Sequence, residues 1–126
     1  MEEQRKKILI VDDSEMNREI LVSMLEDEYD LIQAEDGQQA VYIMSEHHME
    51  LSLLLLDMNM PVMNGYEATA AIRSHRKYRE KQIPIIAMTA NAFAEDVVMA
   101  KNAGMKEHIA KPWEMNRLCE IMQRYL

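Results

Sequence analysis

Two kinds of apolar segment alternate along the chain. One kind is a short run rich in Ile, Leu and Val, and the other places its apolar residues three or four positions apart. The first kind is typical of β-strands and the second of amphipathic helices. The predicted strands are residues 7–13, 29–35, 51–57, 83–90 and 108–110, and the predicted helices are residues 14–27, 36–48, 64–75, 92–104 and 112–126. Five strand–helix units in succession predict an α/β fold with a doubly wound parallel sheet and right-handed crossovers.

Residues 51–57, LSLLLLD, carry the clearest strand signal. Four consecutive leucines leave no polar face, so we expect a strand that helices cover on both sides of the sheet. The helices instead show apolar stripes, and Ser14 is the expected cap of the first one. We expect the following residues to face the core: Ile20, Leu21, Met24 and Leu25; Ala40, Val41 and Met44; Leu118, Ile121, Met122 and Tyr125.

The chain length of 126 residues fits one domain. Open sheets of this kind commonly have the strand order 2-1-3-4-5 of flavodoxin-like folds, and we expect that order here. Residues 1–6 are then an N-terminal tail, and residues 7–126 form a single five-stranded (βα)5 domain.

Charge and composition narrow the range of functions. The formal net charge of −8 opposes attraction to DNA or to anionic membrane surfaces, so we expect no direct nucleic-acid binding. No apolar stretch approaches the ~18 residues that cross a bilayer, and no signal peptide is recognisable, so we expect no membrane insertion and a cytoplasmic location. The single cysteine, Cys119, excludes an internal disulfide and a metal site made of cysteines alone, and its helical context predicts a core or half-buried thiol.

Acidic residues stand at the ends of two strands. Asp12 and Asp13 end the first strand, and Asp57 ends the third. These strands are neighbours in the order 2-1-3-4-5, and ligands of open α/β sheets bind beyond the carboxyl ends of the strands. Three carboxylates in one crevice repel one another unless some are protonated or a cation binds, and oxygen ligands favour Mg²⁺ over zinc. Each acid also has a structural alternative, because Asp13 could cap the first helix, Asp12 could be a solvated loop residue, and Asp57 could begin a turn.

Two other strand ends supply groups that contact anions. Thr89 near the end of the fourth strand offers a hydroxyl, and Lys111 after the fifth offers an ammonium. Taken singly, Thr89 could be a cap or strand residue and Lys111 a surface lysine. Together with acids that hold Mg²⁺, they form a site suited to phosphoryl transfer, in which a carboxylate can act as the nucleophile and form an aspartyl phosphate.

Four segments resemble the signature blocks of the response-regulator receiver domain of two-component signalling. They are ILIVDDSEMNREIL, LLLLDMNMPVMNGYEA, IIAMTANAF and GMKEHIAKPW, and the resemblance extends over residues 7–126. TANAF and AKPW are similar to segments in receivers of hybrid histidine kinases. The resemblance implies that Asp57 accepts a phosphoryl group from a phosphohistidine of a histidine kinase or a phosphotransfer protein.

The resemblance also implies a magnesium cofactor. Asp13, Asp57 and the backbone carbonyl of Asn59 would ligate the Mg²⁺ ion, and Asp12 would act mainly through a metal-bound water. These assignments come from the family's pattern and not from the spacing of the acids.

The same resemblance implies how the domain switches. Thr89 and Lys111 would contact the phosphoryl oxygens, and Thr89 would move towards them on activation. This movement would change the face formed by the fourth helix, fifth strand and fifth helix, which would bind a downstream effector protein or domain. Family members usually hold the bond that corresponds to Lys111–Pro112 in the cis form.

Three features depart from the family's pattern. His108 stands three residues before Lys111, where relatives mostly carry Tyr or Phe as the switch residue. Asn64 precedes Gly65 where many relatives have Asp, and an Asn-Gly turn accommodates this change. Residues 73–82, RSHRKYREKQ, are polar and somewhat long, and we expect a solvated helix end and loop there.

Three other functions are compatible with the predicted fold. A Mg²⁺-dependent phosphohydrolase with an Asp nucleophile would need a substrate pocket, and the sequence has no insertion to build a cap. A pseudo-receiver that is never phosphorylated is disfavoured because every expected site residue is present. Flavin binding is disfavoured because DDSEMN after the first strand repels a phosphate unless a metal intervenes. We therefore expect mainly a signalling switch that catalyses its own phosphorylation and dephosphorylation.

Overall fold

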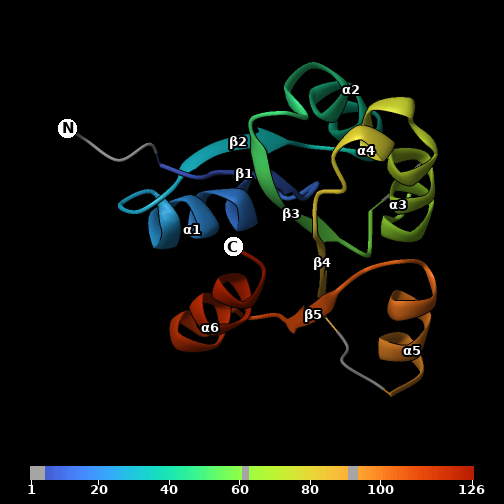
Figure 1. Ribbon diagram of the computed structural model, residues 1–126. Helices are drawn as coiled ribbons and strands as arrows, with labels where there is room; N and C mark the ends of the chain where they lie inside the picture. Colours follow the sequence, from blue (N-terminus) through green and yellow to red (C-terminus); the bar gives the residue numbers. More distant parts are fainter. Residues whose placement is uncertain (1–4, 61–62, 91–93) are drawn as a thin grey trace.

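The fold was analysed in a computed structural model, which describes residues 5–60, 63–90 and 94–126, with only the backbone of 94–97 (Figure 1). Strands and helices alternate along the described chain, as the apolar pattern predicts. The elements are β1 (Lys7–Val11), α1 (Glu15–Leu25), β2 (Asp30–Ala34), α2 (Gly37–His47), β3 (Leu51–Asp57), α3 (Gly65–Ser74), α4 (Arg76–Glu80), β4 (Ile85–Thr89), α5 (Ala94–Asn102), β5 (Glu107–Ala110) and α6 (Met115–Tyr125). Because α4 is an additional short helix, the predicted fourth and fifth helices are α5 and α6.

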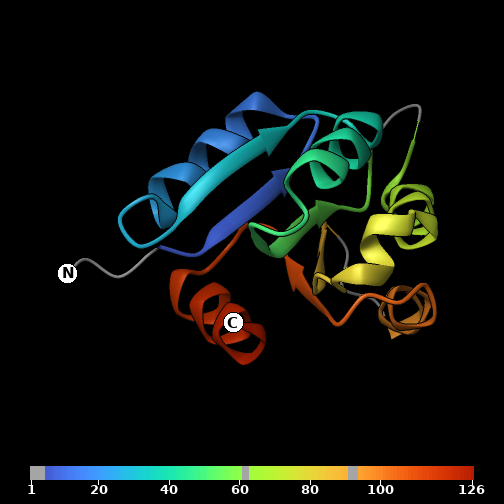
Figure 2. The ribbon, with the colours of Figure 1, turned by 45° about the horizontal axis from the view of Figure 1, so that its top comes forward.

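The five strands form one parallel sheet in the order β2-β1-β3-β4-β5, which confirms the predicted topology. Figure 2 shows β1 and β2 side by side and pointing the same way. The carboxyl ends of all five strands therefore meet at one edge of the sheet. Asp57 of β3 pairs with Met88 of β4, and Thr89 of β4 pairs with Ala110 of β5.

β3 lies in the centre of the sheet, and its leucines are buried on both faces. Leu54 and Leu56 belong to one core cluster, whereas Leu53 and Leu55 belong to the other. Burial of each leucine side chain contributes about 1.5–3 kcal/mol, so β3 is firmly anchored in the core. The apolar run of β3 thus reflects burial on both faces of the sheet, as predicted.

Helices cover the sheet on both sides (Figure 1). α1 and α6 pack on one face, and α2, α3, α4 and α5 pack on the other. Leu21 and Leu25 of α1 are fully buried, but Ile20 is 42% exposed, so the prediction that Ile20 faces the core is wrong. Leu21 and Leu25 are four residues apart and therefore lie on the same face of α1. Ile20 lies about 100° around the helix from Leu21 and so faces away from this buried stripe.

The other predicted apolar stripes are confirmed. α2 buries Ala40 and Met44, with Val41 packed against the same cluster, and α6 buries Leu118, Ile121 and Met122. Met24 and Tyr125 pack against the opposite cluster as partly buried residues. Cys119 is a free thiol of intermediate exposure, in agreement with the predicted half-buried position.

The polar segment 73–82, where we expected a solvated helix end and a loop, contains the end of α3 and also the short helix α4. Its Tyr78 is buried in the core, which fixes the segment to the sheet. The Lys77 ammonium donates to the carbonyl oxygen of Ser45, near the end of α2, at 2.6 Å, and Lys81 donates to that of Met49 at 2.8 Å. The basic side chains thus satisfy carbonyls at the C-terminal end of α2, a contact between segments that no local pattern encodes.

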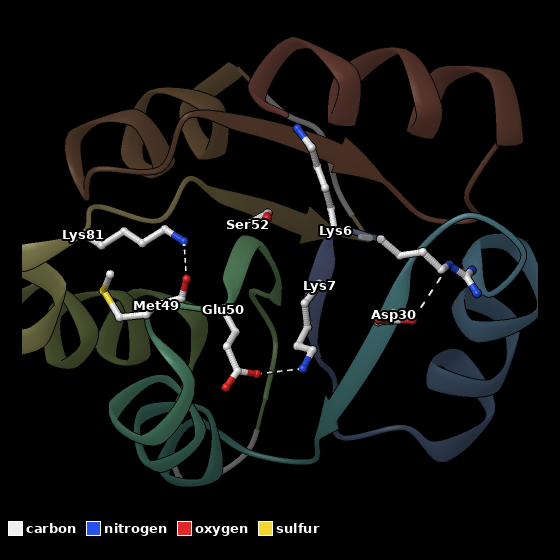
Figure 3. Close-up of a pocket in the computed structure, with 8 residues that line it drawn as sticks. Lys6, Lys7, Asp30, Met49, Glu50, Ser52 and Lys81 are labelled. Atoms are coloured by element: carbon white, nitrogen blue, oxygen red, sulfur yellow. Dashed lines mark hydrogen bonds and ion pairs between the residues drawn. The ribbon is translucent and has the colours of Figure 1, made fainter. Parts of the chain in front are cut away.

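The opposite edge of the sheet, where the strands begin, carries paired charges around a shallow hollow (Figure 3). Lys7 bonds Glu50 at 2.7 Å, and Arg5 lies 3.8 Å from Asp30. The Lys6 ammonium donates to the carbonyl oxygen of the C-terminal Leu126. Each of these cations thus has an acceptor, and the contacts connect residues 5–7 to neighbouring segments.

Within the described ranges, no helix combines the length and the apolar character that a membrane crossing requires. The longest helices have 11 residues, which is about half of the ~20 that a spanning helix needs.

Candidate functional site

The predicted site residues meet at the carboxyl edge of the sheet. Asp57 is the last residue of β3, Asp12 follows β1, and Thr89 is the last residue of β4. Lys111 follows β5, and its amide donates to the carbonyl oxygen of Thr89 at 2.8 Å. The bond between Lys111 and Pro112 is cis, as the resemblance to receivers implied.

The three acids form one cluster. One carboxylate oxygen from each of Asp12, Asp13 and Asp57 lies within 4.8 Å of the other two. Asp12 is fully buried and Asp57 is 1% exposed, whereas Asp13 is exposed. The cluster thus consists of two buried carboxylates and a third on the solvent side.

Lys111 lies between the two buried carboxylates. Its ammonium nitrogen is 3.1 Å from Oδ2 of Asp12 and 3.2 Å from Oδ1 of Asp57, and its side chain is 20% exposed. Three ionised carboxylates and one ammonium leave two uncompensated negative charges in the cluster. Charges this close to a low-dielectric interior interact strongly, so the cluster could hold a metal ion.

The pKa of Asp57 is raised to about 6. Burial is the largest cause, because it removes water from the charged form, and the nearby Asp12 carboxylate adds repulsion. The amide of Asn59, which donates to Oδ1 of Asp57 at 3.1 Å, and the Lys111 ammonium both oppose the rise. A further positive charge beside Asp57 would therefore stabilise its ionised form.

Asp12 is held by Ser14 and by two residues that the sequence alone did not single out, Asn17 and Arg18. The amide of Ser14 donates to Oδ1 of Asp12 at 2.9 Å, and the side-chain amide of Asn17 donates to Oδ2 at 3.4 Å. Arg18 donates to the carbonyl oxygen of Asp12 at 2.6 Å. The sequence feature that could have pointed to Asn17 and Arg18 is their position at the start of α1, directly after the end of β1.

Ser14 caps α1, as predicted. Its hydroxyl accepts from the amide of Asn17 at 3.2 Å, so the alternative reading of Asp13 as the helix cap is wrong. Asp13 is left exposed next to the two buried acids. Its position suits a carboxylate that binds a cation from the solvent side.

The start of α3 lies against the end of β3. Asn64 caps α3, with its side-chain oxygen accepting from the amide of Glu67 at 2.9 Å, and Glu67 closes a capping box. Asn64 thus replaces Asp as a cap of similar quality. A Cβ at Gly65 would lie 2.7 Å from Cα of Met58 and 2.8 Å from the carbonyl oxygen of Asp57, so glycine permits this approach.

Thr89 and His108 stand at the side of the cluster that leads to α5 and α6. Thr89 is buried at the end of β4. His108 of β5 pairs with Ala87 of β4, and its side chain is 26% exposed, with Nδ1 3.9 Å from Oε1 of Glu107. The imidazole is therefore partly open to solvent.

The family model described as "Response regulator receiver domain" matches residues 8–123. This chain belongs to the response regulator receiver domain family. The cluster of Asp12, Asp13 and Asp57 at the carboxyl edge of a 2-1-3-4-5 sheet is the acidic site typical of phosphorylatable response regulators. The resemblance seen in the sequence is thus confirmed.

Similar receivers cover nearly the whole chain. The polar-differentiation response regulator DivK of Brucella ovis is 31% identical over 96% of both chains. The receiver of the sensor histidine kinase PA1611 from Pseudomonas aeruginosa, solved with a magnesium ion in its active-site cleft, is 36% identical with a TM-score of 0.83, covering 97% of this chain and 98% of that one. The receiver of Ssk1 from Saccharomyces cerevisiae, solved with the phosphotransfer protein Ypd1, is 27% identical with a TM-score of 0.85, covering 96% of this chain and 88% of that one.

The raised pKa of Asp57 predicts how stability depends on pH. The folded-state pKa of about 6 lies above the ordinary value of 3.8, so ionising Asp57 lowers the free energy of unfolding as the pH rises through this range. We expect Asp57→Asn to raise the metal-free free energy of unfolding by about 1–3 kcal/mol at pH 8. The gain should vanish near pH 4, because both side chains are then neutral.

Urea unfolding in EDTA at a series of pH values measures this difference. The exposed Asp13→Asn variant is the matched control, and its gain should be smaller. An Asp57→Asn variant no more stable than the wild type at pH 8 would contradict the role of burial and of Asp12 at this site.

Proposed function

We propose that this receiver is a phosphorylatable signalling switch in which Asp57 accepts the phosphoryl group. The main support is the position of its carboxylate, which is buried at a strand end, 3.2 Å from the Lys111 ammonium and within 4.8 Å of two other acids. An ionised carboxylate is a competent nucleophile for a phosphoryl group. Of the three acids, Asp57 is the one that lies at the centre of the sheet edge, between the ends of β1 and β4.

The reaction transfers one phosphoryl group. A carboxylate oxygen of Asp57 attacks the phosphorus of a phosphohistidine, the P–N bond breaks, and the imidazole of the donor keeps the electron pair. The products are an aspartyl phosphate and a histidine. Lys111, and Thr89 after a movement towards the site, donate to the phosphoryl oxygens and stabilise their negative charge.

The chemistry of the donor set supports a magnesium cofactor. Asp13, Asp57 and the backbone carbonyl of Asn59 would hold Mg²⁺, and Asp12 would act mainly through a metal-bound water. The two uncompensated negative charges of the cluster match the charge of one divalent cation. The related PA1611 receiver contains magnesium in its cleft. When bound, the ion neutralises charge on the phosphoryl oxygens.

Two surfaces are suited to the partners of such a switch. Met16 and Ile20 of α1 are 69% and 42% exposed, one turn apart on the helix that follows Asp13 directly. We infer that the phosphoryl donor, a histidine kinase or a phosphotransfer protein, docks there, as the Ypd1–Ssk1 complex supports for the class of partner. Val98 and Met99 of α5 and Met115 of α6 are also exposed on the face proposed to bind an effector.

Asp57→Asn is expected to abolish phosphorylation while the fold is retained, because an amide is a far poorer nucleophile than a carboxylate. Incubation with acetyl phosphate and Mg²⁺ followed by intact mass measurement detects the adduct, and EDTA should prevent it. Asp13→Asn keeps the acceptor and should slow labelling without abolishing it. Labelling of Asp57→Asn at the wild-type rate would place the acceptor elsewhere. Rapid multiple turnover by the wild type would indicate a phosphohydrolase. A wild type that forms no adduct would indicate a pseudo-receiver.

Ile20→Glu is expected to slow transfer from a protein donor by about five- to thirtyfold, as the loss of one ~1–2 kcal/mol interface contact predicts. Labelling by acetyl phosphate should not change, because the small donor needs no docking surface. The measurement uses a phosphorylated histidine phosphotransfer domain that labels the wild type. Tyr42→Glu on α2 is the control, since Tyr42 is 66% exposed and belongs to another helix. Equal effects of both variants would remove the support for docking on α1.

The switch is expected to involve His108. We propose that its imidazole, now 26% exposed, moves inward when Thr89 is drawn to the phosphoryl group. In an NMR spectrum with a soluble gadolinium chelate, the His108 ring signal should lose relaxation enhancement when beryllofluoride and Mg²⁺ are added. The signals of His47, His48 and His75 are internal controls, and His108→Phe assigns the signal. An enhancement that stays the same or increases would exclude the inward movement.

A further inference from the structure

Trp113 lies beside the ammonium that bridges the acidic cluster. The Nζ atom of Lys111 is 5.8 Å from the centroid of the Trp113 ring, within the ~6 Å range of a cation–π contact. The same atom is 3.1 Å from Asp12 and 3.2 Å from Asp57. The ammonium therefore has an aromatic ring as a third neighbour besides its two carboxylates.

The Trp113 ring is fixed by packing. It is partly buried against the core cluster that contains Ile109 of β5 and Leu118 of α6. Its indole nitrogen is buried and has no hydrogen-bond partner within the described part of the chain. Because no hydrogen bond within the described part of the chain orients the indole, its position depends on the core against which it packs.

Lys111 needs such a neighbour. Its ammonium ends a flexible four-carbon chain and is 20% exposed, so rotamers that turn towards water compete with the bridging position. A ring held by the core makes the bridging position more favourable without adding a charge to the cluster. Asp12 and Asp57 alone would attract the ammonium but would not limit it to one rotamer.

We propose that Trp113 is a positioning residue for Lys111. Its ring holds the ammonium between Asp12 and Asp57 and keeps it ready for the phosphoryl oxygens. The part of Lys111 in phosphoryl transfer rests on the function proposed above, whereas the contact between ring and ammonium does not depend on that function.

Fluorination of the ring separates this role from simple packing. Trp113 is the only tryptophan of the chain, so fluorinated tryptophan supplied during expression changes this ring alone. Successive fluorine atoms weaken the attraction of the ring for a cation and change its shape little. A packing role would not follow the number of fluorine atoms, whereas a cation–π role would.

The first measurement is the equilibrium constant of unfolding in EDTA. In the wild type we expect it to increase with the number of fluorine atoms, by about two- to fivefold over the series, the equivalent of one cation–π contact. In Lys111→Met the series should be flat. If that variant does not fold, Trp113→Phe and Trp113→Leu replace it. The equilibrium constant of unfolding should then increase less in Trp113→Phe than in Trp113→Leu, because the phenyl ring retains part of the cation–π contact. A wild-type series without a trend would overturn the proposal.

The second measurement is the rate of labelling by acetyl phosphate with saturating Mg²⁺. The rate should fall in the same order of fluorination, by about two- to fivefold. A labelled wild type with a flat series in both measurements would overturn the role of Trp113 alone. A wild type that acquires no phosphoryl group, with a graded series in EDTA, would overturn the proposed function and leave the contact intact.

Discussion

Asp12 and Asp57 are buried next to each other, and among the described residues the Lys111 ammonium is the one cation that contacts both. A buried carboxylate that lacks a partner costs several kcal/mol, so this arrangement persists only because the surrounding sheet holds the three groups in place. Burial and, to a lesser extent, repulsion from the Asp12 carboxylate raise the pKa of Asp57, and the negative charge of the cluster makes the site receptive to a cation. The structure therefore stores, at one edge, a charge imbalance that a divalent ion can relieve.

The core provides the rigidity that this arrangement requires. The leucines of β3 are buried on both faces, so the strand delivers Asp57 to the sheet edge without freedom to slip. The first turn of α1 holds Asp12 through Ser14 and Asn17, and Gly65 allows α3 to begin against the last residues of β3. The acids are thus positioned from three separate elements, each anchored in the core.

The same geometry connects the site to the surfaces of the domain. Lys111 links the cluster to β5 and to Trp113, which packs against the core cluster that includes the buried residues of α6. Thr89 ends β4 and His108 lies on β5, and the Lys111 amide donates to the carbonyl oxygen of Thr89. The site is therefore built on the two strands that precede α5 and α6 in the chain, and Asp12 precedes α1, which carries exposed apolar residues.

The sequence by itself determined the element order and the acids, hydroxyl and lysine at the strand ends, because apolar periodicity and strand termini are local properties. The strand order was expected from what is common among open α/β sheets of this kind, and the structure has that order. The sequence predicted Ser14 as the cap of the first helix but did not determine that Asp12 is buried while Asp13 is exposed. It assigned Ile20 to the core and residues 73–82 to a solvated helix end and loop, although Ile20 is exposed and Tyr78 anchors an additional short helix there. The bridging position of Lys111 and the ring of Trp113 beside it were decided only by tertiary structure, since they join β1, β3 and the segment after β5, which are distant in sequence and meet through packing of the core.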